Sequence, residues 1–349
     1  MTVSSALPEV SRALERLANR QDLDREQAAE VLQLIMDGRV GEVQAAAFLM
    51  GMRAKGETAD EIVGMAQTMS ELAERVHVDC QDQLVDTCGT GGDGLGTFNI
   101  STTAAFVVAG AGVPVAKHGN RGATSRSGSA DLLEALGVRI DLAPEQVARC
   151  IRQVGIGFMF APLHHKAMRH IVPVRRDLGI RTVFNFLGPL TNPAGARRQL
   201  VGVSSPDYVR VLGEALALMG AERALVVHGE EGLDELSVTA SSQVIEVRDG
   251  VVAAEYRLQP EALGLQHWEL ADVRGAGPEE NARITLAILE GHTFADAPSQ
   301  ITLLNAAAAL YVADAVDSLP AGIDAAREIV ASGAALEKVR QLTAVSHEV

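Results

Sequence analysis

A glycine-rich run at residues 86–103 holds the clearest chemistry in this sequence. Five glycines fall between Gly89 and Gly96, after a short apolar segment at 84–85 and before an alanine- and valine-rich stretch. This order predicts a strand, a loop and a helix. A glycine-rich loop lets backbone N–H groups crowd around a phosphate, and a helix N-terminus adds unpaired N–H groups and a partial positive charge. The run therefore predicts a site for a phosphorylated ligand.

The details of this loop separate it from commoner phosphate loops. No Gly-Lys-Ser/Thr follows the glycines, so it is not a Walker loop, and the glycine steps lack the Rossmann spacing. Asn99 and Ser101 are both suitable caps for the following helix. A turn built for packing alone would not need the polar side chains that are interleaved with the glycines. These are Thr90, Asp93, Thr97, Asn99, Ser101 and Thr102.

A second loop of this kind covers residues 117–129, between a strand expected at 113–116 and a helix expected at 130–137 that ends on Gly137. Its basic side chains stand out in a chain of net charge -15. Arginine grips a phosphate as a fork, and lysine acts as a point charge. A solvated surface loop is the alternative for this segment alone, but two neighbouring strand–loop–helix units favour an anion site. The basic residues are Lys117, His118, Arg121 and Arg126.

Adjacent carboxylates at Asp234 and Glu235 follow a strand expected at 224–227. Such hard oxygen ligands suit Mg²⁺, which keeps most of its waters in protein sites. The Ser101 hydroxyl is a third oxygen candidate. By chemistry alone Glu230 and Glu231 are an equally good pair, and a solvated acidic loop explains either pair in so acidic a chain.

The elements that must position these residues begin with a helical segment. The first 75 residues predict four helices, and the third of them is apolar over more than one stripe, which indicates either an internal core or a subunit interface. Capping boxes begin the second and the fourth helix, at Asp24 with Gln27 and at Thr58 with Glu61. The four helices are expected at 8–18, 24–38, 41–54 and 58–75.

From residue 80 onward, apolar strand patterns alternate with helices, which predicts an α/β domain with a mainly parallel central sheet. Ligands of such sheets bind beyond the C-terminal ends of the strands, where both loops would lie. The expected strands are at residues 84–85, 113–115, 138–140, 157–160, 200–203, 224–227, 244–247 and 251–255, and helices are expected at 206–219 and 278–290 among others.

Composition narrows the class of protein. A chain of 349 residues with 47% hydrophobic and 21% charged residues is globular and long enough for two domains. Its net charge of -15 argues against a nucleic-acid or anionic-membrane partner. Three cysteines without a metal-binding spacing fit a reducing compartment. Neither a signal peptide nor an apolar span of about 20 residues is seen, so we expect a cytoplasmic protein.

Five strings carry a resemblance in the order in which they occur: GTGGD at 89–93, NIST at 99–102, KHGNR at 117–121, and longer stretches at 173–193 and 227–237. Together they resemble the anthranilate phosphoribosyltransferases of tryptophan synthesis, and the resemblance spans nearly the whole chain. It implies a nucleoside phosphorylase-like phosphoribosyltransferase fold, with a small all-helical N-terminal domain and a larger α/β domain.

The resemblance also implies how these domains are arranged. The implied helical domain is residues 1–78, rejoined by about 171–198 through a hinge. The implied α/β domain is residues 79–170 with 199–349, and it binds the sugar pyrophosphate. The active site would lie in the cleft between the domains, and the protein would be a homodimer formed through the helical domain.

The reaction that the resemblance implies is Mg²⁺-dependent transfer of the phosphoribosyl group of 5-phosphoribosyl-1-pyrophosphate to the amine of anthranilate. The implied Mg²⁺ ligands are Ser101, Asp234 and Glu235, and the implied anthranilate residues are Gly89, His118, Asn120 and Arg175. Arg175 would meet the carboxylate, while the adjacent Arg176 would be solvated or ion-paired. No residue is assigned as a catalytic acid or base. The residues implied for the sugar pyrophosphate are Gly89, Gly92, Asp93, Thr97, Asn99, Ile100, Ser101, Thr102, Lys117, His118, Gly119, Asn120, Arg121, Gly122, Ala123, Thr124, Ser125 and Ser129.

Two rival functions remain in view. A pyrimidine nucleoside phosphorylase of the same broad fold binds phosphate and a nucleoside, but the Asp234–Glu235 pair and the string at 99–102 count against it. A relative that holds nucleic acid in the same cleft without catalysis is opposed by the net charge. His164 and His165 are expected to line or pack the site rather than to act in catalysis.

Overall fold

The computed structural model describes residues 7–122 and 125–349. It divides into two compact units, and each is described by itself. The helical unit contains the residues up to Glu74 together with His165–Thr191, and the α/β unit contains Arg75–His164 and Asn192–Val349. No helix of the described ranges is both long and apolar enough to cross a membrane.

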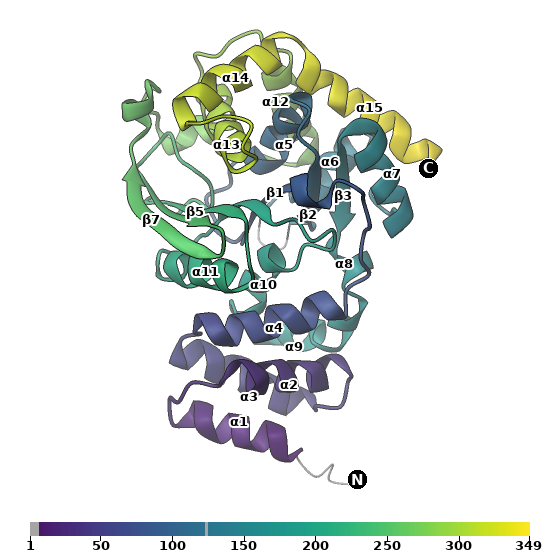
Figure 1. Cartoon of the computed structure of the whole chain (residues 1–349), viewed down its shortest axis with the longest axis vertical. Helices are drawn as coiled ribbons and strands as arrows, with labels where there is room; N and C mark the ends of the chain where they lie inside the picture. The colour runs from purple at the N-terminus through teal and green to yellow at the C-terminus, as the bar shows by residue number, and fades with distance from the viewer. Residues whose placement is uncertain (1–6, 123–124) are drawn as a thin grey trace. The chain divides into compact units, whose positions relative to one another are not determined.

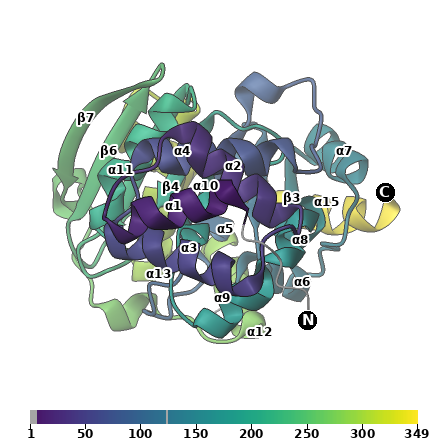
Figure 2. The ribbon, with the colours of Figure 1, turned by 90° about the horizontal axis from the view of Figure 1, so that it is seen from below.

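Short-range capping builds the helical unit. The Asp24 side chain accepts from the Gln27 backbone N–H at 2.8 Å, and Thr58 and Glu61 form the same reciprocal box. Both predicted capping boxes are therefore confirmed. α2 packs against α4, and α1 packs against α3 (Figure 2). The helices are α1 (Pro8–Ala18), α2 (Arg25–Met36), α3 (Glu42–Lys55), α4 (Ala59–Glu71), η2 (Lys166–His170), α9 (Val172–Leu178) and α10 (Phe184–Leu190).

The α/β unit is built on one sheet of seven strands in the order β3-β2-β1-β4-β5-β6-β7. The first five strands of the chain pair in parallel, and β6 and β7 add antiparallel hairpin pairs at one edge. The predicted mainly parallel sheet is thus confirmed. The strands are β1 (Val85–Gly89), β2 (Val115–Gly119), β3 (Ile156–Phe160), β4 (Arg198–Gly202), β5 (Arg223–Gly229), β6 (Ser242–Arg248) and β7 (Val251–Leu258).

Helices cover both faces of this sheet, which explains why its parallel strands read as continuous apolar runs. Figure 1 shows α5 and α13 on one side and α11 on the other. The remaining bounds are η1 (Gln81–Gln83), α5 (Ile100–Gly110), α6 (Ser129–Ala135), α7 (Pro144–Val154), α8 (Ala161–His164), α11 (Asp207–Leu218), η3 (Pro260–Leu263), η4 (Leu270–Val273), α12 (Pro278–Leu289), α13 (Ala297–Val312), α14 (Leu319–Ala331) and α15 (Ala334–Glu348).

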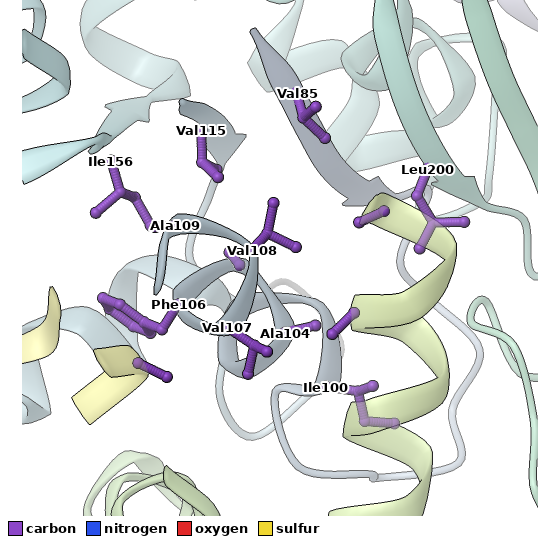
Figure 3. Close-up of a cluster of buried hydrophobic side chains, with 14 of the residues drawn as sticks. Val85, Ile100, Ala104, Phe106, Val107, Val108, Ala109, Val115, Ile156 and Leu200 are labelled. Atoms are coloured by element: carbon purple, nitrogen blue, oxygen red, sulfur yellow. The ribbon is translucent and has the colours of Figure 1, made fainter. Parts of the chain in front are cut away.

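The core of the unit surrounds α5, the helix that follows the glycine-rich loop. Figure 3 shows Val85, Val115 and Leu200 of the strands grouped with Phe106 and Val108 of α5. α13, α14 and α15 pack on the other sides of α5, which accounts for its almost uniformly apolar sequence. The helix that bears the loop is therefore held rigidly by its surroundings.

The strand expected at residues 138–140 is wrong. Gly137 ends α6 with a φ of +85°, as the sequence predicts, but the chain then runs to α7 without pairing in the sheet. Val138 and Ile140 are buried in the core, so their alternation reflects packing alone. The backbone N–H of Arg139 donates to the Ser346 hydroxyl of α15 at 3.0 Å, where a strand would have used a neighbour in the sheet.

The unit boundaries lie at residues 74, 164 and 191, whereas the sequence analysis expected them near 78, 170 and 198. The Val76 backbone N–H donates to the Pro193 carbonyl at 3.0 Å. Val76 and Val78 also belong to the core of the α/β unit, as do Ala194 and Ala196. Both connecting stretches therefore pack with the sheet rather than with the helices.

Candidate active site

The glycine-rich loop leaves the sheet where the strand order reverses. β1 lies between β2, which follows it in the chain, and β4, which lies on the other side. Ligands of open α/β sheets bind outside the carboxyl ends of the strands at this switch point. Gly91, Gly92, Gly94 and Gly96 all have a positive φ between 67° and 76°, which only glycine adopts readily. The loop conformation thus requires the glycines that the sequence places there.

Asp234 lies directly against this loop. Its carboxylate accepts from the Gly91 backbone N–H at 2.6 Å. A Cβ added to Gly89 would lie 2.5 Å from Asp234 Oδ2, and a Cβ added to Gly202 would overlap the Asp234 carbonyl. The glycines at the ends of β1 and β4 therefore let the Asp234 segment approach the strand ends closely.

Glu235 lies at the same C-terminal ends of the strands and is held there by α5. Its carboxylate accepts from the Ser101 backbone N–H at 3.1 Å, at the first turn of the helix. Burial raises the pKa of Asp234 to about 6, with a further contribution from the nearby Asp93. Burial and the charge of Asp234 raise the pKa of Glu235 to about 8. The two acids therefore resist being ionised together, and a cation beside them would favour their charged forms.

This donor set fits Mg²⁺. The half-buried Asp234 and the buried Glu235 carboxylates, with the Ser101 hydroxyl, are hard oxygen ligands, and a divalent cation would relieve the repulsion between the two acids. Across residues 7–122 and 125–349, no group of three His, Cys, Asp or Glu side chains is arranged as a metal cage. An ion held here would therefore need oxygen from water or from a ligand, as Mg²⁺ sites commonly do.

The rival acidic pair is used differently. Glu231 accepts from the hydroxyls of Ser237 and Thr239, the latter at 2.6 Å. Glu230 forms an ion pair with Arg257 at 3.2 Å. Sequence chemistry alone left the two pairs equal, whereas the structure brings only Asp234 and Glu235 to the glycine-rich loop.

Lys117 differs from the sequence expectation of a basic side chain in a loop. It lies on β2 with a side chain only 2% exposed, and its Nζ donates to the Thr87 carbonyl and lies 3.5 Å from Ser101 Oγ. Burial lowers the pKa of Lys117, and the neighbouring Asp86 opposes this shift. Its positive charge is thus held beneath the first turn of α5, next to the acidic pair.

The second loop is organised by a carboxylate of α6. Asp131 accepts from the backbone N–H groups of Gly122 and Gly128, at 2.9 and 2.8 Å. Arg121 forms ion pairs with Asp131 and Glu134. The guanidinium expected to clamp a phosphate is therefore engaged by two acids of its own unit. Ala123 and Thr124 were also predicted for this site and lie outside the described residues.

A hydroxyl pair joins the two helices that follow the loops. Thr102 Oγ1 of α5 donates to Ser129 Oγ of α6 at 3.1 Å. A Cβ added to Gly119 would also lie 3.1 Å from the Ser129 Cβ. Residues of the two predicted phosphate loops are thus brought together at one edge of the sheet.

Arg175 lies in the helical unit, on α9. Its guanidinium is 5.2 Å from the centre of the Phe184 ring, and burial lowers its pKa. Arg176 is exposed and pairs with Asp177 at 3.3 Å, as the sequence predicts for adjacent arginines that point apart. His164 and His165 are both buried, which agrees with a packing role.

Known proteins match this chain over nearly all of its length. Residues 81–336 match the glycosyl transferase family, a/b domain, and residues 11–73 match the helical bundle domain of the same family. An anthranilate phosphoribosyltransferase of Symbiobacterium thermophilum is 52% identical over 333 residues, covering 95% of this chain and 96% of the relative. One from Anaeromyxobacter sp. (strain K) is 53% identical over 337 residues, covering 97% of this chain and 98% of the relative.

The chain belongs to the anthranilate phosphoribosyltransferase family.

Solved structures of this family share the fold. The anthranilate phosphoribosyltransferase of Thermus thermophilus superimposes with a TM-score of 0.90 at 45% identity, covering 96% of this chain and 99% of that one. The enzyme of Saccharomyces cerevisiae in complex with PRPP and Mg superimposes with a TM-score of 0.89 at 27% identity, covering 97% of this chain and 98% of that one. The family resemblance and the fold class stated from the sequence are both confirmed.

Two residues near this site, Asp86 and Asn281, were not predicted from the sequence. Asp86 is fully buried, and its carboxylate accepts from the Asn192 side chain at 2.7 Å. Asn281 is also fully buried and donates to Asn99 at 2.8 Å. An acidic residue directly after an apolar segment and just before a glycine-rich loop could have indicated Asp86. Nothing in the sequence pairs residue 281 with residue 99.

Proposed function

We propose that this chain transfers the phosphoribosyl group of 5-phosphoribosyl-1-pyrophosphate to the amine of anthranilate, a pentosyl transfer of tryptophan biosynthesis. The products are N-(5-phosphoribosyl)anthranilate and pyrophosphate. Relatives with about half of their residues identical over nearly the full length carry this activity in their names. The observation that carries the proposal is the glycine-rich loop at the sheet's switch point, backed by the acidic pair Asp234–Glu235.

The donor is bound by the α/β unit in this proposal. The loop glycines and the N-terminus of α5 present backbone N–H groups, and Asn99, Ser101 and Thr102 add polar side chains there. 5-Phosphoribosyl-1-pyrophosphate carries about four to five negative charges at neutral pH. Asp234 and Glu235 would hold Mg²⁺ together with the Ser101 hydroxyl. Mg²⁺ held there would supply positive charge to offset the negative charge of the pyrophosphate leaving group.

The acceptor requires positioning rather than a strong base. An aromatic amine is unprotonated at pH 7, so its nitrogen is already nucleophilic, and we assign no acid or base. Arg175 is proposed to bind the anthranilate carboxylate as a fork. Gly89, His118 and Asn120 are proposed to surround the amine and the ring. Holding two reactants in line is worth up to about 7–11 kcal/mol in favourable cases.

The proposal extends to the domains and the oligomer. The helical unit, which contains the residues up to Glu74 with His165–Thr191, would form a homodimer. Val43 and Met50, seven residues apart on α3, are 84% and 41% exposed, and Val172 and Ile180 around α9 are exposed as well. Exposed apolar side chains of this kind mark interaction surfaces. A cytoplasmic location is proposed because all three cysteines are free thiols.

The test follows anthranilate fluorescence over time with 5-phosphoribosyl-1-pyrophosphate, with and without Mg²⁺. A decrease that needs both substrates and Mg²⁺ is expected. The double variant Asp234→Asn, Glu235→Gln should need more Mg²⁺, while Glu230→Gln, which alters only a surface ion pair, should not. No decrease in a folded sample would refute the function, and phosphorolysis of nucleosides and single-stranded nucleic acid would be tested next.

A further inference from the structure

A segment with no part in the predicted ligand sites crosses the glycine-rich loop. Residues 273–281, here called the strap, run from η4 into the first turn of α12. The Gly275 backbone N–H donates to the Gly96 carbonyl at 2.9 Å, and the Phe98 N–H donates to the Val273 carbonyl at 3.3 Å. A Cβ added to Gly275 would lie 2.6 Å from Phe98 Cα. Strap and loop are thus in direct backbone contact.

One side chain of the strap reaches the ligand-facing part of the loop. Asn281 is fully buried, and its Nδ2 donates to Asn99 Oδ1 at 2.8 Å. Asn99 stands at the N-cap position of α5, yet its side chain does not cap the helix. Instead Asn99 Oδ1 also accepts from the Ser127 hydroxyl at 3.0 Å, and Asn99 Nδ2 donates to the Ser127 carbonyl at 3.2 Å. Asn99 is therefore a junction between both phosphate loops and the strap.

Backbone groups fix the direction of this hydrogen-bond chain at both ends. The Ala276 N–H, which can only donate, meets Asn281 Oδ1 at 2.8 Å. Asn281 must therefore turn its Nδ2 towards Asn99. The Ser127 carbonyl, which can only accept, requires Asn99 to turn its own Nδ2 that way. If the Asn281 amide flipped, two donors would face each other, and if the Asn99 amide flipped, two acceptors would do so.

We propose that Asn281 is a positioning residue for the sugar pyrophosphate. It holds the amide of Asn99 in one orientation and joins the two phosphate loops across the strap. Asn99 Nδ2 carries two hydrogens. Among the described residues the Ser127 carbonyl accepts one of them, so the other can bond to the anionic sugar pyrophosphate. This inference rests on the proposed function of the same site.

The fold supplies a matched control one helical turn further along α12. Thr285 is also fully buried, and its hydroxyl lies 2.9 Å from the hydroxyl of Thr103 on α5. This second pair joins the same two helices four residues beyond the first. It does not involve the side chain of Asn99. Thr285→Val therefore removes a buried hydrogen bond from the same helix interface without disturbing the amide chain.

The experiment compares Asn281→Asp, Asn281→Ser and Thr285→Val with the wild-type enzyme. An aspartate at 281 places an oxygen against Asn99 Oδ1, while serine removes the donor. The readouts are kcat, the KM for each substrate, the Kd for 5-phosphoribosyl-1-pyrophosphate with Mg²⁺ by calorimetry, and Tm. Loss of a hydrogen bond to a charged ligand predicts that KM and Kd for the sugar pyrophosphate rise about tenfold in both Asn281 variants. The KM for anthranilate should change less than about twofold on the same reasoning.

Thr285→Val should lower Tm while leaving the KM for the sugar pyrophosphate at its wild-type value. The inference is overturned if the Asn281 variants lose only stability, as Thr285→Val does, or if the KM values of both substrates rise equally. If Asn281→Asp does not fold, Asn281→Ser decides on the same readouts. A wild-type protein that binds no sugar pyrophosphate would overturn the proposed function as well, whereas active, unaffected Asn281 variants would overturn this inference alone.

Discussion

Gly89→Ala should weaken Mg²⁺ binding at the site through a single methyl group. The added Cβ would lie 2.5 Å from Asp234 Oδ2, and Cβ atoms essentially never approach heavy atoms closer than 3.0 Å. The carboxylate must therefore move by at least about 0.5 Å, more than the ±0.2 Å within which metal–ligand distances usually fall. The hydrogen bond from Gly91 N at 2.6 Å would lengthen with it. We expect the half-saturating Mg²⁺ concentration to rise about 10–100-fold.

The assay is the initial rate of anthranilate consumption across a Mg²⁺ titration at saturating substrates, with Tm measured in parallel. Gly89 has no positive φ, so alanine is not strained there and Tm should stay close to that of the wild type. Gly41→Ala is the matched control, because a Cβ at this position meets no atom within 4 Å. A Gly89→Ala enzyme with the wild-type Mg²⁺ dependence would refute the close contact as the reason for the glycine.

Three further predictions concern separate parts of the chain. Arg175→Ala should raise the KM for anthranilate roughly 10–100-fold and the KM for the sugar pyrophosphate far less. An equal rise in both KM values would show that Arg175 does not bind anthranilate specifically. Val43→Glu should turn a dimer into a monomer by light scattering while Val251→Glu, also an exposed apolar position, should not, and a persisting Val43→Glu dimer would exclude this face. Burial raises the pKa of Asp86 from 3.8 to about 6, so ionising it costs the folded state stability as pH rises through that window. In urea titrations Asp86→Asn should therefore gain up to about 3 kcal/mol relative to the wild type between pH 4 and pH 7, and an unchanged difference would contradict the burial argument.

Local features were readable from neighbouring residues. The capping boxes at Asp24 and Thr58 involve partners three residues away, so the short spacing in the sequence is the interaction itself. Gly91 and Gly96 adopt the positive φ that a tight phosphate loop needs. The alternation of apolar strands and helices likewise predicted the parallel sheet, because crossover helices must cover both of its faces.

Two differences between sequence and structure show what local patterns leave out. Residues 138–140 have a strand-like alternation, yet the Arg139 N–H finds the Ser346 hydroxyl, a partner more than 200 residues away in the chain. Lys117 looked like a loop cation but lies buried on β2 beneath α5. In both cases the outcome depended on which element packs alongside, and no neighbouring residue encodes that.

The kinds of groups at the site follow from local sequence, because glycine conformations, helix starts and strand ends are set within a few residues. Which of these groups meet depends on how distant segments pack in the folded chain. This packing separated Asp234 and Glu235 from Glu231, whose carboxylate is taken up by Ser237 and Thr239. It also placed Asn281 against Asn99 across 182 positions of sequence. Hydrogen bonds act over about 3 Å in space, so distances along the chain place no limit on them.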